Sequence, residues 1–77
     1  MAGAREMIVF ISYENTGSPE EIGRALIEAL HLGSAALGVD LLTGACEVRF
    51  GYDPYLYNEA QAWLVSRSVL HDISLIG

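Results

Sequence analysis

Two helix-start signals, each following a strand-like run, constrain the fold of this chain more than any other feature. Ser18-Pro19 follows the β-branched and aromatic run Met7–Tyr13. Asp53-Pro54 follows the alternating run Ala45–Tyr52. Serine and aspartate are favoured N-caps, and proline is accommodated at the first helical position because that position needs no N–H donor. The sequence therefore predicts a strand followed by a capped helix, twice.

The first helix carries the clearest pattern. Glu21 lies three residues after Ser18, as in a capping box, and Gly33 is placed as the C-terminal stop. The predicted apolar face has the helical spacing i, i+3, i+4, i+7 and i+8. It consists of Ile22, Ala25, Leu26, Ala29 and Leu30.

The second helix and the last strand follow the same logic. After Asp53-Pro54, one side of the predicted helix is apolar, and the short run Asp72–Ile76 predicts a closing strand. The predicted apolar side consists of Leu56, Ala60, Trp63, Leu64 and Leu70.

Residues 35–42 are compatible with two structures. Val39–Leu42 predicts a short strand turned back by Thr43-Gly44, and a short second helix after Gly33 is the alternative. The strand is favoured because a clear strand follows it. The resulting order β-α-β-β-α-β matches the ferredoxin-like arrangement, an α+β two-layer sandwich. It has a four-stranded antiparallel sheet with two helices on one face, and we expect residues 1–77 to form a single domain.

The sheet face without helices is predicted to meet a partner. Apolar residues make up 52% of the chain and charged residues 18%, more apolar surface than a small interior can cover. We therefore expect a homodimer or another bound protein on the open face. The residues assigned to this face are Met7, Val9, Ile11, Glu47 and Arg49.

The charge balance excludes some partners. Ten acidic residues and four arginines give a formal net charge of −6. Phosphate backbones and anionic lipid surfaces need a basic face, so we expect no direct nucleic-acid or membrane binding. A basic protein surface would be attracted to this chain, although solubility alone also explains such a charge.

The residues that could carry chemistry are isolated. Cys46 lies on the apolar side of its strand, and His31 and His71 are placed near helix ends. We find no catalytic constellation and no metal-ligand spacing, so we expect a non-enzyme without a cofactor or metal. The lone cysteine, and the absence of a basic-then-apolar leader pattern at residues 1–6, favour a cytoplasmic protein.

An aromatic and acidic group of residues is the candidate partner-binding surface. Tyrosine is enriched in protein interfaces. In the second helix and its cap the candidates are Asp53, Tyr55, Tyr57 and Glu59, and at the end of the first strand they are Tyr13 and Glu14. A structural role at the edge of the core is the alternative for the two helix tyrosines.

Three functional hypotheses remain open, and the third is an enzyme whose site is built across a dimer interface from Tyr13, Glu14 or His71. The first is a non-catalytic interaction protein or small acidic inhibitor that occupies the surface of a partner protein. A basic, nucleic-acid-binding surface is one possibility for that partner, and a phage-type inhibitor is one possibility for this chain. The second is a regulatory domain that binds a small molecule at a homodimer interface.

Overall fold

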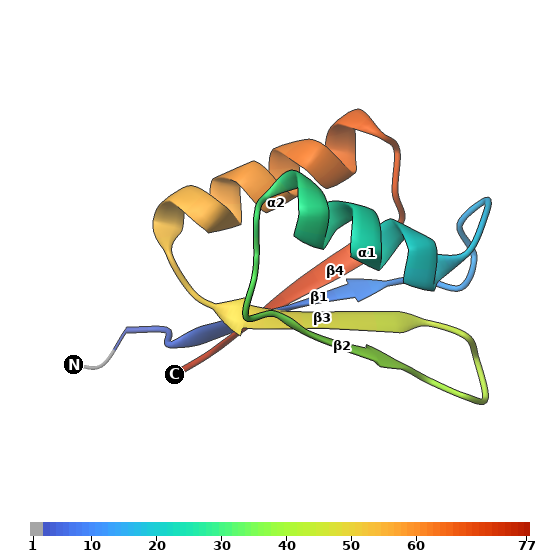
Figure 1. The fold of residues 1–77 in the computed structure, drawn as a ribbon, viewed down its shortest axis with the longest axis horizontal. Coiled ribbons are helices and arrows are strands. Elements are labelled where there is room, and N and C mark those ends of the chain that lie inside the picture. Colours follow the sequence, from blue (N-terminus) through green and yellow to red (C-terminus); the bar gives the residue numbers. More distant parts are fainter. Residues whose placement is uncertain (1–2) are drawn as a thin grey trace.

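A computed structural model describes residues 3–77 as one sheet covered by two helices (Figure 1). The strands are β1 (Glu6–Ile11), β2 (Ala36–Val39), β3 (Cys46–Gly51) and β4 (His71–Ile76), and the helices are α1 (Pro19–Ala29) and α2 (Pro54–Ser66). Adjacent strands are antiparallel, in the order β2-β3-β1-β4. Both helices lie on the same side of the sheet (Figure 1). The predicted α+β ferredoxin-like sandwich is confirmed. Met1 and Ala2, part of the segment used to judge a leader, lie outside the described residues.

Both predicted helix starts are present. The Oγ atom of Ser18 accepts a hydrogen bond from the backbone N–H of Glu21 at 3.3 Å. The carboxylate of Asp53 accepts from the N–H groups of Tyr55 and Leu56 at 2.9 and 3.2 Å. Each cap satisfies N–H groups that a helix start leaves without an intrahelical partner. These two local signals therefore place the helices correctly.

The helix ends differ from the prediction. α1 ends at Ala29, and His31, rather than Gly33, adopts the left-handed conformation with φ +55°. The backbone N–H of Leu32 then donates to the carbonyl of Ile27 at 2.9 Å, as in a Schellman motif. Buried Leu32 joins the core, so the helix ends where the next apolar side chain must turn inward.

The end of α2 repeats this geometry. Ser68 has φ +56°, and the N–H of Val69 donates to the carbonyl of Leu64 at 3.0 Å. Leu70 was assigned to the apolar side of this helix. It lies beyond the helix end at Ser66 and is exposed, so that assignment is wrong.

The core fills the space between the sheet and the helices. Its fully buried side chains come from β1, β3 and both helices, and Gly23 brings α1 close to β3. These side chains include Met7, Val9, Ile11, Leu26, Cys46, Val48 and Leu64. Of the predicted α1 face, Ala25 and Ala29 are exposed, because they line the gap between the two helices.

The predicted open face is wrong for its three β1 residues. Met7, Val9 and Ile11 have no exposed surface and belong to the core under the helices. Residues directly opposite each other in antiparallel strands share a face, and Val9 lies opposite core residue Val48. The open face of β1 instead carries Ile8 and Phe10, which lie opposite Arg49 and Glu47 of β3. Glu47 and Arg49 are on this face, as predicted, and are exposed.

Residues 35–42 form a strand, as favoured, but with different bounds. β2 is Ala36–Val39, whereas Val39–Leu42 was expected. The N–H of Asp40 donates to the carbonyl of Ala45 at 2.8 Å, which closes a hairpin loop of residues 41–44. Leu41 and Leu42 therefore belong to a loop rather than to the sheet.

Candidate protein-interaction surface

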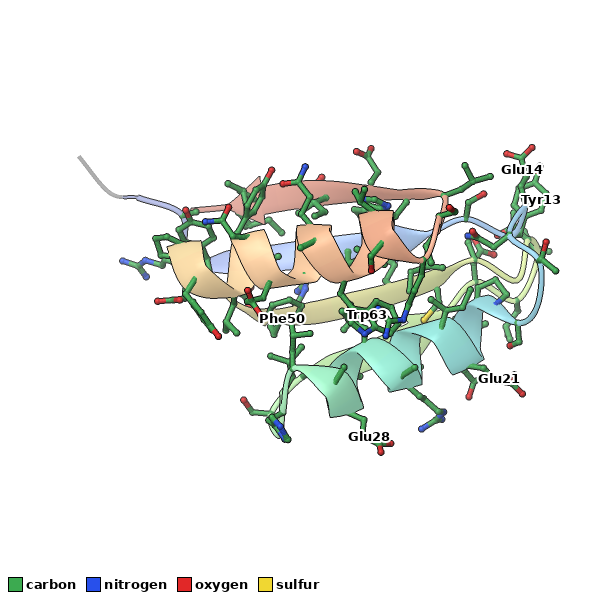
Figure 2. All side chains as sticks on the ribbon, turned by 90° about the horizontal axis from the view of Figure 1, so that it is seen from above. Tyr13, Glu14, Glu21, Glu28, Phe50 and Trp63 are labelled. Atoms are coloured by element: carbon green, nitrogen blue, oxygen red, sulfur yellow. The ribbon has the colours of Figure 1, made fainter. Side chains whose placement is uncertain are left out.

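The predicted partner-binding residues are divided between opposite ends of the molecule. Tyr13 and Glu14 lie in the loop after β1, at one end in Figure 2. α2, which begins at Pro54, starts at the other end of the sheet (Figure 1). The structure therefore does not bring the two groups together.

At the start of α2, two of the predicted contacts have structural roles. Asp53 caps the helix, as described above. Tyr57 is half-buried, and its ring packs edge-on against that of Tyr52, with centroids 6.4 Å apart. Tyr55 and Glu59 are exposed. This end therefore offers one free tyrosine rather than an aromatic cluster.

The most exposed apolar side chains lie on the β2–β3 hairpin. Leu41 is 95% exposed and Leu42 is 97% exposed. We call these two adjacent residues the leucine tip. Such positions are usually occupied by Gly, Asn, Asp, Ser or Pro, so two leucines there need an explanation other than turn formation.

Hydrogen bonds hold the leucine tip in a defined conformation. The Oδ1 atom of Asp40 accepts from the N–H groups of Leu42 at 2.8 Å and Thr43 at 3.3 Å. The hydroxyl of Thr43 accepts from the N–H of Ala45 at 3.2 Å, and Gly44 takes a left-handed φ of +81°. Because these bonds hold the backbone of the loop, a partner that contacts the leucines has mainly their side chains to order.

The same end of the molecule is aromatic and acidic. Figures 1 and 2 both place the hairpin tip and the loop after β1 at this end. In that loop Tyr13 is 59% exposed and Glu14 is exposed. Asp40 and Glu21 add carboxylates there, and Glu20 is paired with Arg24 at 2.8 Å. The leucine tip thus lies at the same end of the molecule as several carboxylates.

The sequence analysis places the leucine tip in a strand because a clear strand follows it. The signal that identifies it is the spacing of Asp40 and Gly44 around them. An aspartate that accepts from the backbone two residues later and a glycine with positive φ are typical of a turn.

Cys46 has the properties of a core side chain. It is fully buried, and burial raises the pKa of its thiol above the ordinary value of 9.0, with the nearby charge of Glu20 adding to the effect. The thiolate is the reactive form, so this cysteine is poorly placed to act as a nucleophile. It behaves as the small apolar residue that the sequence predicts.

The histidines lie apart from each other. His71 begins β4 rather than ending a helix, and its Nδ1 atom lies 2.7 Å from the carbonyl oxygen of Val69. His31 is exposed after α1. Within residues 3–77 no group of three or more His, Cys, Asp or Glu side chains could hold a metal ion.

An open groove runs between the two helices. Its volume is about 520 Å³, with Ala25 and Ala29 of α1 on one side and Trp63 and Arg67 of α2 on the other. The guanidinium carbon of Arg67 lies 4.2 Å from the centroid of the Trp63 ring, a cation–π contact.

No helix in the described part of the chain has the length and apolar character needed to cross a bilayer.

Comparison with known proteins gives no relative for this chain: no family model, curated protein or solved structure matches it.

Proposed function

We propose that this chain is a non-catalytic protein-interaction module that occupies a basic surface of another protein. The observation that carries the proposal is the leucine tip, two leucines almost fully exposed on a hydrogen-bonded loop. Burying one leucine side chain is worth about 1.5 to 3 kcal/mol. A partner that covers the tip gains this free energy twice, and the loop is already ordered.

The charge of the chain supports a basic partner. With −6 overall and no lysine, and with Glu14 and Asp40 at the same end as the leucine tip, a basic surface is attracted and an acidic one repelled. Basic surfaces are typical of proteins that bind nucleic acids. Covering such a surface would make the chain an inhibitor without any chemistry of its own.

The test compares three immobilised proteins: the wild type, the double variant Leu41→Ser/Leu42→Ser, and the control Val65→Ser. Val65 is 62% exposed on α2, away from the hairpin. Lysate of cells that produce the chain is passed over each, at low and at moderate salt, and bound proteins are identified by mass spectrometry. All three substitutions are at exposed positions, so matching thermal melts are expected.

We expect one or more basic proteins to be retained by the wild type and by Val65→Ser but lost from the double variant. Retention should weaken as salt rises, because salt screens charges more than a Debye length of about 8 to 10 Å apart. Equal retention on all three proteins, or retention of nothing even at low salt, would contradict the proposal.

A small-molecule-sensing domain is the second candidate, and the groove between α1 and α2 is the observation that favours it. Its volume of about 520 Å³ is within the range of ligand pockets. A thermal-shift screen of amino acids, nucleotides and cofactors tests it, because a ligand that binds the folded state raises the melting temperature. The increase should disappear in Ala29→Trp, which fills the groove.

A further inference from the structure

The two outer strands of the sheet, β2 and β4, differ in how their free edges are protected. In an antiparallel pair, alternate residues bond to the neighbouring strand and the others point their N–H and C=O groups outward. An outward row of such groups is a template for pairing with another strand. The two edges therefore have to be compared bond by bond.

On β4 the middle of the free edge is occupied by the chain itself. The N–H of Ser12 donates to the carbonyl of Leu70 at 3.0 Å. With the observed register, every second residue from Leu70 therefore directs its backbone N–H and C=O groups toward β1. Ile73 consequently points its N–H outward, and this N–H donates to Oδ1 of the adjacent Asp72 at 3.1 Å. A carboxylate on the edge both occupies the donor and opposes another strand.

On β2 the free edge is short, but no side chain occupies its outward backbone groups. The bond from the N–H of Asp40 to Ala45, together with the register to β3, directs the backbone groups of Leu37 and Val39 outward. Within residues 3–77 no side chain bonds to these two N–H groups. The strand Ala36–Val39 also contains no charge and no proline, the two residue features that usually protect an edge.

The surroundings of this edge indicate what kind of strand would fit. On the helix side, Leu37 packs against the core and Val39 is 38% exposed, so an apolar side chain beside them would be buried. On the open side, Gly38 has no side chain and lies opposite Glu47 of β3. A strand added beyond β2 would lie about 10 Å from β3, which is two strand spacings. A lysine or arginine of the added strand and Glu47 of β3 are long enough to meet above Gly38.

Further carboxylates lie on the helix above the edge. α1 packs on β2 and β3, and Figure 2 shows Glu21 and Glu28 on the side of α1 away from α2. At the end of β2, Asp40 is exposed and leads directly into the leucine tip. The edge of β2 is therefore apolar where it would pair. Around it the carboxylates outnumber two arginines, Arg24, which is paired with Glu20, and Arg49, which lies opposite Ala36.

We propose that the free edge of β2 binds an extended segment of a partner protein by strand addition, a segment in which apolar residues alternate with arginine or lysine. The inference rests on the proposed function and specifies its mode: the added strand pairs with Leu37 and Val39 and continues to the leucine tip. A second copy of this chain is a poorer occupant, because each copy carries −6 and like charges would face each other.

The probe is a displayed library of random linear peptides, selected on the wild-type protein. Enriched peptides are then measured against Val39→Pro and Val39→Ala. Proline removes an outward N–H without removing a bond to β3, whereas alanine removes the side chain and keeps the N–H. We expect alternating apolar and basic peptides, binding to Val39→Ala within a few-fold of wild type, and binding to Val39→Pro at least about tenfold weaker.

A second variant keeps the test valid if Val39→Pro does not fold. Gly38→Asp places a carboxylate directly before Val39, so that it can accept from the N–H of Val39 as Asp72 accepts from that of Ile73. The substitution fits, because a Cβ at Gly38 meets nothing within 4 Å. Although it adds negative charge, we expect it to weaken peptide binding, while Gly38→Ala does not. Amide exchange at Leu37 and Val39 should slow when the peptide binds.

Four results would overturn the inference. They are no enriched peptide, enriched peptides without the alternating basic pattern, wild-type binding by folded Val39→Pro or Gly38→Asp protein, or a wild-type dimer in light scattering that Gly38→Asp dissociates. The last would make the occupant a second copy. If Leu41→Ser/Leu42→Ser loses the cellular partner while Val39→Pro and Gly38→Asp keep it, the proposed function stands and strand addition fails. If all variants retain the same proteins, both fail.

Discussion

Gly23 lies so close to Cys46 that a Cβ atom on its backbone would be 2.8 Å from the Sγ atom. The same position would be 3.1 Å from a methyl group of Val48 and 3.3 Å from one of Leu37. Two strands thus meet the helix at one residue, and the absence of a side chain there sets how closely α1 approaches the sheet.

Replacing Gly23 by alanine is expected to destabilise the protein. Alanine is favoured over glycine in a helix by about 1 kcal/mol, but overpacking a filled core costs about 1 to 3 kcal/mol. We expect the free energy of unfolding in urea to fall by about 1 kcal/mol. The loss of stability caused by Gly23→Ala should be smaller in a background of Cys46→Ala. The exposed control is Gly51→Ala, whose Cβ meets nothing within 4 Å. A more stable Gly23→Ala protein would show that α1 is less tightly packed.

The thiol of Cys46 predicts a loss of stability at high pH. Burial, followed by the charge of Glu20, raises its pKa above the ordinary value of 9.0, although Arg24 partly opposes this. The unfolded chain therefore loses this proton at a lower pH than the folded chain. The stabilisation is complete below pH 9.0 and is lost as the pH rises through the folded pKa.

Urea unfolding of the wild type and Cys46→Ala, between about pH 7 and pH 10, measures this effect. The wild type should lose stability above pH 9.0 more steeply than the variant. A constant difference between the two proteins across this range would contradict the assignment.

The helix starts and the layered fold could be predicted because their signals are local. Ser18 and Asp53 act within their own helices, and the alternation of β3 is unambiguous. The face of β1 could not be predicted in the same way, because Met7–Ile11 is apolar at every position and period two does not distinguish its sides. Only pairing with β3 decides that Val9, opposite Val48, faces inward.

The site was harder to predict than the fold for a related reason. A leucine in an exposed loop and a leucine in a strand have the same hydropathy. Hydropathy therefore does not contradict the strand that the clear strand after it favours at Leu41 and Leu42. Their exposure follows from the bonds that Asp40 makes with the loop. The free edge of β2 is likewise a property of sheet order and register, which no single segment encodes.

Asn15 should contribute more to stability than its loop position suggests. Its Nδ2 atom donates to the carbonyls of Ser12 and Leu70, both at 2.8 Å, and its Oδ1 atom accepts from the N–H of Leu70 at 2.7 Å. The loop after β1 is thereby tied to the residue before β4. Because a hydrogen bond contributes about 0.5 to 1.5 kcal/mol net and water can replace part of it here, we expect Asn15→Ala to cost about 1 to 2 kcal/mol.

The control for Asn15 is Thr16→Ala, an exposed neighbour in the same loop, which should leave the unfolding midpoint unchanged. Amide exchange at Leu70 should accelerate only in Asn15→Ala. Equal stability of the two variants would mean that the loop is held by its backbone alone.

His31 and Gly33 test where α1 ends. His31 has a φ of +55°, which is unfavourable for a residue with a Cβ, whereas Gly33 has no positive φ and a Cβ there meets nothing within 4 Å. We therefore expect His31→Gly to raise the free energy of unfolding by roughly 0.5 to 1 kcal/mol, after the entropy cost of glycine is included. Gly33→Ala should be neutral or slightly stabilising. Thermal or urea unfolding measures both variants. If Gly33→Ala lowers the stability and His31→Gly leaves it unchanged, the helix ends at Gly33, as its sequence alone predicts.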